Sequence, residues 1–180
     1  DIGHNGFHYN FVYDIFGNMT EATIAGTKAV SYVYESDNGN LLKTVYGNGD
    51  SIRYVYDKED RVKESYYQPG NGAAEQKLNS YVYGKDGNLN KVTSHMSGKT
   101  YELSYDFLDR LMRVRDEKGA FYEYTYDADN QMISMVSCSG KNKVITEYTY
   151  DSDGREYEVK MGDATRLIDY DELGRVTGQY

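Results

Sequence analysis

One short motif recurs eight times along this chain and constrains its fold more than any other feature. The motif is an aromatic or apolar residue, one spacer, a tyrosine, usually an aspartate, and then turn-forming residues. Its tyrosines are Tyr13, Tyr34, Tyr56, Tyr83, Tyr105, Tyr126, Tyr150 and Tyr170, at spacings of 21, 22, 27, 22, 21, 24 and 20 residues. A period of this length indicates a tandem array of one supersecondary unit. Such arrays build surfaces and walls more often than catalytic pockets.

The residues around each motif tyrosine follow the period of a β-strand. The positions two before it are Phe11, Tyr32, Tyr54, Tyr81, Leu103, Tyr124, Tyr148 and Ile168. Alternate residues of a strand share a face, so these positions form an aromatic stripe with the motif tyrosines. The intervening residues are only half apolar, which predicts a more solvated opposite face. All apolar residues are interpreted as recurring at every second position, as in a strand, and none follows the period of three and four residues that a helix would show.

A turn signature follows the tyrosine. The opening residues are Asp14, Asp57, Asp106, Asp127, Asp151 and Asp171, and the closing residues include Gly17, Asp60, Asp109, Asn130, Gly154 and Gly174. An aspartate carboxylate accepts backbone N–H groups at the start of such a turn, and the closing position favours residues that tolerate positive φ. A planar side chain such as Arg155 or Arg175 follows, and then an apolar residue begins a return strand. A second turn, usually marked by glycine, closes most units, so each repeat predicts a β-hairpin.

The predicted fold is therefore all-β. Residues 1–180 are expected to form a single array of about eight hairpin repeats of ~22 residues in one continuous antiparallel sheet that twists or spirals. An insertion near residues 68–77 is expected to be a mobile loop. Glu156 replaces the usual apolar residue of the return strand and predicts weaker packing there. The chain is interpreted as a fragment of a larger protein.

Composition excludes several classes of function. The net charge of −9, with Lys and Arg scattered along the chain, argues against nucleic-acid binding, which needs clustered positive charge. The single cysteine, Cys138, excludes an intramolecular disulfide. No apolar run approaches the ~18 residues of a membrane-spanning helix, so membrane insertion is not expected in this segment.

The pattern Tyr-x-Tyr-Asp-x-x-Gly-Arg-Leu resembles the YD repeat of the Rhs family, most plainly at 54–62, 148–155 and 170–176. The resemblance covers nearly the whole chain and implies a sheet that spirals into a hollow shell. Family members include polymorphic toxins, insecticidal toxin complexes, wall-associated proteins and teneurins, and in the toxins the shell encloses a C-terminal effector. The self-cleavage motif of toxin-bearing members is built around Asp-Pro. It is absent here, because the sole proline, Pro69, follows Gln68.

The resemblance implies a structural shell segment of a secreted or cell-surface bacterial protein. Its expected partners are the rest of the shell and its cargo, and edge-to-edge self-association of the separate segment is also expected. The alternative is a carbohydrate-binding or adhesion module. Any glycan contact is expected at tyrosines outside the motif, which are Tyr46, Tyr66, Tyr67 and Tyr157.

Each candidate site also has a structural interpretation, which we favour. The turn aspartates have the chemistry of calcium ligands, but they fit turn caps better because no calcium-binding repeat pattern is present. The tyrosine stripe suits sugar stacking but fits packing within the sheet better. The recurrent arginines would form an anion-binding row, yet neutral Asn18 and Asn88 occupy the same repeat position. No catalytic constellation, metal-ligand set or cofactor motif is found, so no enzymatic activity and no cofactor are predicted.

Overall fold

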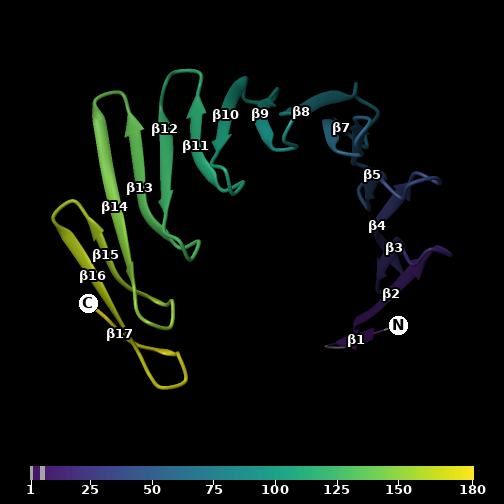
Figure 1. The fold of residues 1–180 in the computed structure, drawn as a ribbon. Helices are drawn as coiled ribbons and strands as arrows, with labels where there is room; N and C mark the ends of the chain where they lie inside the picture. The colour runs from purple at the N-terminus through teal and green to yellow at the C-terminus, as the bar shows by residue number, and fades with distance from the viewer. Residues whose placement is uncertain (1, 5–6) are drawn as a thin grey trace. The chain divides into compact units, whose positions relative to one another are not determined.

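The structure is a computed structural model that describes the backbone of residues 2–4 and 7–180 and the side chains of residues 8–180. The described residues form seventeen strands and no helix, which confirms the predicted all-β fold (Figure 1). They divide into two compact units, Asp1–Val82 with Val92–Gly98 and Tyr83–Lys91 with Lys99–Tyr180. Strand β9, Leu89–Ser94, contributes to both units.

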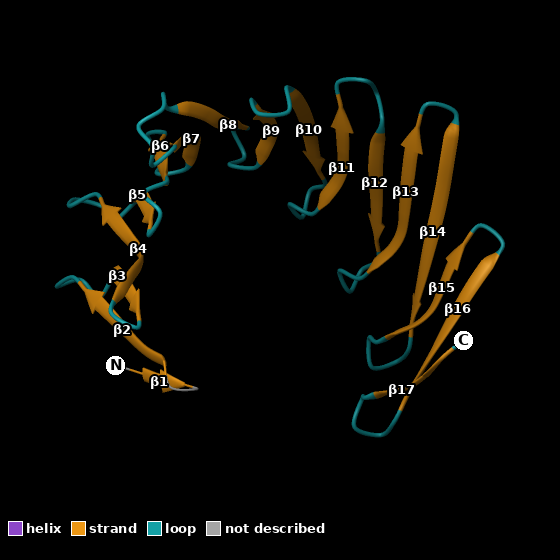
Figure 2. Ribbon diagram, turned by 180° about the vertical axis from the view of Figure 1, so that it is seen from behind, coloured by secondary structure: helices purple, strands orange, loops and turns teal. Residues whose placement is uncertain are grey.

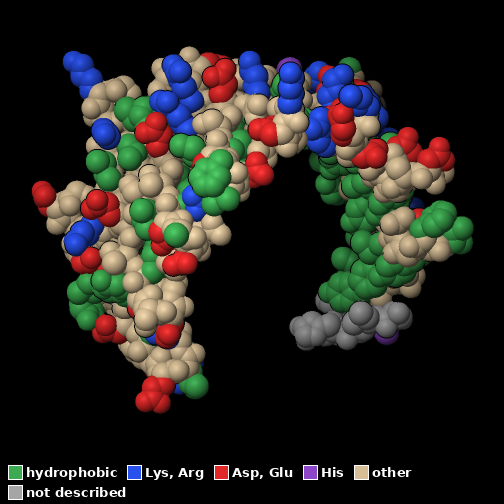
Figure 3. Space-filling view, viewed as in Figure 1, with side chains coloured by type: hydrophobic (Ala, Val, Ile, Leu, Met, Phe, Trp, Pro, Cys, Tyr) green, Lys and Arg blue, Asp and Glu red, His purple; other side chains and the backbone are tan. Residues whose placement is uncertain are grey.

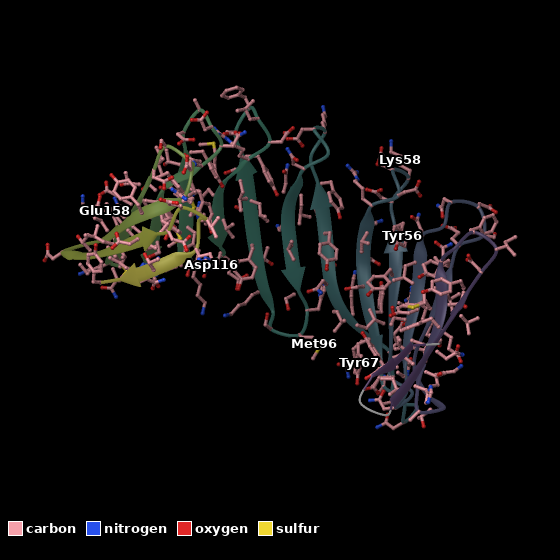
Figure 4. All side chains as sticks on the ribbon, turned by 90° about the horizontal axis from the view of Figure 1, so that it is seen from below. Tyr56, Lys58, Tyr67, Met96, Asp116 and Glu158 are labelled. Atoms are coloured by element: carbon pink, nitrogen blue, oxygen red, sulfur yellow. The ribbon has the colours of Figure 1, made fainter. Side chains whose placement is uncertain are left out.

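Unit 1 is a meander in which each strand pairs antiparallel with the next. Its strands are β1 (Ile2–His4), β2 (Phe7–Tyr13), β3 (Met19–Ile24), β4 (Thr27–Tyr34), β5 (Leu41–Tyr46), β6 (Ser51–Tyr56), β7 (Val62–Gln68) and β8 (Gln76–Tyr83), whose last residue lies in unit 2. The turns that follow the motif tyrosines lie at one edge, and the linking turns lie at the other. Figure 4 shows Lys58 at the first edge and Tyr67 and Met96 at the second.

Unit 2 repeats the same topology. Its strands are β10 (Lys99–Tyr105), β11 (Leu111–Asp116), β12 (Phe121–Tyr126), β13 (Met132–Ser139), β14 (Asn142–Tyr150), β15 (Glu156–Met161), β16 (Ala164–Tyr170) and β17 (Val176–Gln179). The strand ends and turns again alternate between two edges, as Figure 2 shows for β11–β16. The tight turns account for this regularity, because a short hairpin connection sets the register of both of its strands.

A β-bulge recurs at one position of the repeat. In β12–β13, Thr125 pairs with Ser134 and Tyr126 pairs with Met132, so Ile133 is the extra residue. The equivalent extra residues elsewhere are Thr20, Leu42, Lys63, Met112, Tyr157 and Thr177. The bulge shows that the expectation of apolar residues at every second position was wrong. Because the strand has one extra residue, Met132 and Met135 lie on the same face although they are three residues apart.

The two faces of each sheet differ in chemistry. The tyrosine face carries the motif tyrosines and the residues paired with them. The opposite, charged face carries side chains such as Glu64 and Lys77, whose Oε1 and Nζ lie 2.6 Å apart. In unit 1, hydrophobic side chains form a contiguous surface over β2–β5 (Figure 3). In unit 2, Glu156 pairs in register with Tyr150 on the tyrosine face, and its Oε1 lies 2.8 Å from Arg166 Nη2.

Neither unit has the interior of a two-layer domain. Among the described residues only Ala22 and Ile168 are buried hydrophobic side chains, and no large side chain is fully buried. Most motif tyrosines are half-buried. Because a single-layer sheet buries so little apolar area, hydrogen bonds between neighbouring strands and turns must carry much of the specificity of the fold.

The insertion is a loop anchored at both ends. Gln68 ends β7 and Gln76 begins β8, so the loop itself is 69–75. The Gly70 N–H donates to Asp50 Oδ1 at 2.8 Å near one end. Near the other end, the Arg53 guanidinium donates to both carboxylate oxygens of Glu75 at 2.9 and 2.7 Å. The structure thus gives this longer connection defined contacts with β6 and with the neighbouring turn.

Candidate functional site: the YD turns

The aspartate that opens each YD turn, the turn after a motif tyrosine, is a cap for that turn. Asp106 Oδ1 accepts the backbone N–H groups of Leu108 and Arg110 at 2.9 and 3.0 Å, and its Oδ2 accepts Arg110 Nε–H at 2.7 Å. Equivalent bonds are made by Asp14, Asp57, Asp127, Asp151 and Asp171. Both oxygens of Asp106 are therefore engaged within its own hairpin.

These hydrogen bonds hold the pKa of most turn aspartates below the ordinary value. The Arg61 side chain is the main cause of the lowered pKa of Asp57. The backbone N–H groups of Arg155 and Arg175 are the main cause of the lowered pKa of Asp151 and Asp171. Burial would raise the pKa of Asp106, but its bonds from Arg110 and Leu108 outweigh this effect. The carboxylates are consequently stabilised as anions, which suits a cap better than a proton-transfer group.

The residue that closes the turn joins neighbouring repeats. Asp60, Asp109 and Asn130 adopt positive φ values of 57°, 60° and 66°, where Gly17, Gly154 and Gly174 stand in other repeats. Each of the three non-glycine residues accepts a bond from the preceding repeat. The donors are Asn40 Nδ2 to Asp60 Oδ1 at 2.8 Å, Asn88 Nδ2 to Asp109 Oδ1 at 2.7 Å, and Arg110 Nη1 to Asn130 Oδ1 at 3.0 Å. This bond helps offset the strain of a side chain at positive φ.

A glycine at the same position accepts through its backbone. Gln131 Nε2 donates to the Gly154 carbonyl at 3.1 Å. The planar side chain that follows the turn thus reaches the next turn in four repeats, through Asn40, Asn88, Arg110 and Gln131. We call this row of bonds the turn ladder. The two residues joined by each bond are 20–23 residues apart in the sequence. The turn ladder therefore cannot be inferred from the pattern of a single hairpin.

The motif tyrosines form a second set of bonds between repeats. Tyr126 OH donates to the Leu111 carbonyl at 2.9 Å, at the start of the preceding return strand. The same bond joins Tyr34 to Met19, Tyr56 to Leu41, Tyr105 to Leu89, Tyr150 to Met132 and Tyr170 to Glu156, at 2.7–3.0 Å. Tyr83 is half-buried at the end of β8, and Tyr13 is 58% exposed. Each bonded phenol therefore links one hairpin to the hairpin before it.

Replacing Tyr126 with phenylalanine tests the contribution of this phenol bond. We expect Tyr126→Phe to lower the free energy of unfolding by about 1 kcal/mol, because the Leu111 carbonyl loses a donor. Urea unfolding measures the change. Tyr122→Phe is the matched control on the same strand, since Tyr122 is 50% exposed and its hydroxyl makes no hydrogen bond to any residue that the structure describes. Equal losses in the two variants would contradict a specific role for the Tyr126 bond.

The recurrent arginines are held by local partners. Arg110 and Arg155 pair with the aspartates of their own turns, and their Cζ atoms lie 4.8 and 5.0 Å from the ring centroids of Tyr126 and Tyr170. Arg175 Nε lies 2.7 Å from Asp171 Oδ2. A guanidinium in this position balances the turn carboxylate and packs on the next tyrosine.

The tyrosines expected at a glycan site differ in their surroundings, and Tyr157 belongs to unit 2 whereas the other three belong to unit 1. Tyr66 lies on the charged face, where Arg53 Cζ is 4.2 Å from its ring centroid and its hydroxyl donates to Glu64 at 2.6 Å. Tyr67 hydrogen-bonds Asp50, which raises the pKa of the tyrosine. Tyr46 is 43% exposed on the tyrosine face, and Tyr157 is 39% exposed at its bulge. Of the four tyrosines, Tyr46 and Tyr157 are the more exposed.

The described residues contain one contact of a kind used in nucleophilic catalysis. Ser80 Oγ lies 2.7 Å from His95 Nε2, and His95 is exposed. Among the described side chains, no carboxylate orients this histidine as a catalytic triad requires. No group of three or more histidine, cysteine or acidic side chains in the described part of the chain could hold a metal ion. None of the described residues forms a helix long and apolar enough to cross a membrane.

Comparison with curated proteins identifies the family, although no family model matches the chain. The chain is 31% identical over 167 residues to the tRNA3(Ser)-specific nuclease WapA of Bacillus spizizenii, which covers 88% of this chain. It is 26% identical over 186 residues to Teneurin-1 of Gallus gallus, which covers 93% of this chain. This chain belongs to the YD-repeat (Rhs) family. The YD-repeat segment spans only 6–7% of the length of these relatives.

Solved structures show the same fold within larger complexes. The Tc holotoxin pore of Photorhabdus luminescens matches with a TM-score of 0.72 and 20% identity over 87% of this chain and 9% of that chain. The TcdB2-TccC3-Cdc42 complex matches with a TM-score of 0.59 and 14% identity over 95% of this chain and 11% of that chain. The YD-repeat segment therefore shares its antiparallel hairpin sheet with segments of these complexes.

Proposed function

We propose that this YD-repeat segment is a structural wall, one part of a hollow β-shell that encloses a C-terminal toxin or effector. The turn ladder is the observation that carries the proposal. In four of the YD turns the planar side chain is bound to the next repeat, as in the bonds from Asn88 to Asp109 and from Arg110 to Asn130. Residues with these contacts serve the continuity of a sheet. The segment itself then carries no catalysis.

The comparisons support a cargo outside this segment. One relative is named as a nuclease, yet this chain corresponds to only 6% of its length. One of the solved structures with this fold is a Tc holotoxin pore. We infer that any effector of the parent protein lies outside residues 1–180, and that the parent is secreted or displayed at the cell surface. The partners of the segment would be the adjoining shell and the enclosed cargo.

Protease protection in the full-length parent protein tests this proposal. We expect the region C-terminal to the repeats to resist proteinase K in the native protein, because a closed wall excludes the protease. After unfolding in urea and dilution into the protease, the same region should be cut rapidly. Mass spectrometry of the surviving fragments identifies the protected residues. A cryo-EM reconstruction of the same sample should show repeat sheet around the protected chain.

Equal rates of cleavage in the native and unfolded protein would contradict enclosure. A parent protein that has no chain beyond the repeats would contradict it as well. The alternative of a carbohydrate-binding or adhesion module stays a prediction, as does edge-to-edge self-association of the separate segment. Two of the tyrosines expected to contact a glycan already interact within the segment, Tyr66 with Arg53 and Glu64, and Tyr67 with Asp50.

A further inference from the structure

Strand β14 extends beyond the strand that pairs with it on one side. On the β13 side its pairing continues to Ser139 opposite Asn142. On the β15 side its pairing stops at Thr146 opposite Met161, because the β15–β16 hairpin turns back just beyond that point. Figures 1 and 2 show the β13–β14 hairpin projecting past the β15–β16 turn. Residues 142–145 therefore form a half-strand with one open side.

The register indicates which backbone groups face the open side. A two-residue connection, Gly140–Lys141, joins Ser139 to Asn142, and the closing pair of such a hairpin is hydrogen-bonded. Antiparallel ladders alternate, so Asn142, Val144 and Thr146 bond toward β13. The N–H and C=O groups of Lys143 and Ile145 then point toward the position that β15 does not reach. A row of free groups of this kind is a template for another strand.

A hollow of about 630 Å³ lies at this position. It is lined by Lys143, Val144, Ile145, Glu147, Lys160, Met161 and Gly162. Val144, Ile145 and Met161 are 42%, 43% and 53% exposed, although they are apolar. The open strand edge thus lies beside exposed apolar side chains on both faces of the sheet. Peptides that add a strand to a sheet use this combination, in which main-chain bonds supply affinity and side-chain contacts supply specificity.

The charge around the open edge favours an acidic occupant. Lys141 and Lys143 are exposed, and the structure pairs neither with a carboxylate in the part of the chain that it describes. Lys160 Nζ lies 3.0 Å from Glu158, and Glu147 is opposite Lys160 in the register. The exposed Asp163 lies in the β15–β16 turn, whereas the two lysines that the structure leaves unpaired, Lys141 and Lys143, lie at the other end of the open edge.

We propose that the open edge of β14 at Lys143 and Ile145 binds an extended segment of another polypeptide by β-strand addition. The segment alternates apolar residues, which contact Val144 and Met161 on the tyrosine face, with acidic residues, which face Lys143 on the charged face. This site is independent of whether the sheet encloses an effector. It requires only the difference in length between the β13–β14 and β15–β16 hairpins.

Amide hydrogen exchange in the whole chain tests whether the edge is open. The amides of Lys143 and Ile145 are expected to exchange at least about tenfold faster than those of Val144 and Thr146, because only the latter pair is bonded to β13. NMR resolves the four amides individually. Equal protection of all four would show that the edge is already covered and would overturn the proposal.

Peptide binding tests the occupant. The probe is a short fluorescein-labelled peptide that alternates Glu and Val, and the control probe alternates Lys and Val. Fluorescence anisotropy is expected to show binding of the acidic probe at least about tenfold tighter than binding of the basic probe. Binding of the acidic probe should also slow exchange at Lys143 and Ile145. Equal affinity for the two probes, or no binding of the acidic probe, would overturn the proposal.

Two variants and a control locate the binding site. Lys143→Glu is expected to weaken binding of the acidic probe about fivefold, because an attraction between exposed charges becomes a repulsion. Ile145→Pro removes an N–H that faces the open side of β14 and leaves the bonds to β13 intact. This variant is expected to weaken binding of the acidic probe at least about tenfold. Lys118→Glu makes the same charge change at an exposed lysine in the β11–β12 turn and should leave the affinity unchanged. Unchanged binding in Lys143→Glu would refute this location.

Discussion

Replacing Gly70 with alanine is expected to lower the free energy of unfolding by about 2–3 kcal/mol, because the new methyl group meets backbone that cannot yield. A Cβ built at Gly70 would lie 2.5 Å from the Asn48 carbonyl oxygen and 2.6 and 2.8 Å from the carbonyl carbon and Cα of Gly49. These atoms belong to the linking turn of the neighbouring hairpin. The two turns pack backbone against backbone, so relieving the clash requires separating the hairpins.

Gly178→Ala is the matched control for Gly70→Ala. Gly70 and Gly178 both lie outside the positive-φ region, so the comparison isolates steric contact from backbone strain. The nearest atom to a Cβ at Gly178 is Asp169 Oδ2 at 3.6 Å, an ordinary van der Waals distance. Urea unfolding followed by far-UV circular dichroism measures both variants. A loss at Gly70 no larger than the loss at Gly178 would contradict the close approach of the two turns.

The stability of the chain is expected to fall steeply in acid. The pKa values of Asp14, Asp50, Asp57, Glu64, Glu75, Asp106, Asp151 and Asp171 all lie below their ordinary values in the folded chain. The unfolded chain therefore binds more protons than the folded chain as the pH falls through this range. By linkage, the stabilisation is fully present above the ordinary pKa values and is lost as the pH falls through the lowered ones.

The urea midpoint measured from pH 7 to pH 3 tests this dependence. We expect it to begin to decrease near about pH 5 and to decrease most steeply below about pH 4. Asp106→Asn should destabilise the chain at pH 7 and differ less from the parent at pH 3, because the stabilisation from the lowered pKa of Asp106 is lost as the pH falls. Asp163→Asn, at an exposed aspartate in the β15–β16 turn, should follow the parent at every pH. A midpoint independent of pH would contradict the role of these carboxylates.

The alternation and turn chemistry of the repeat were sufficient to predict hairpins. Tyr124 and Tyr126 with a turn beginning at Asp127 predict a strand that ends in a tight turn, and the structure has β12 ending at Tyr126. The bulge was missed because apolar residues were expected at every second position throughout each strand. Met132 and Met135 are three residues apart, and that spacing was the available signal. Only a residue count against the partner strand identifies Ile133 as the extra residue.

The contacts between repeats were beyond sequence reasoning for a different reason. Asn88 and Asp109 are 21 residues apart, and their bond depends on two turns lying at adjacent positions along one edge. The open side of β14 depends on where the β15–β16 hairpin ends relative to the β13–β14 hairpin. Local patterns specify each hairpin separately, whereas these features arise from the register between hairpins.

The sequence by itself determined the unit of this protein, because strand period and turn preference are local properties of residues such as Tyr126, Asp127 and Asn130. The tertiary structure decided what those residues do for one another. Tyr126 bonds the Leu111 carbonyl of the preceding repeat, and Asn130 accepts from Arg110 while at positive φ. Such bonds depend on the positions of two hairpins at once, so they exist only after the strands have paired in register.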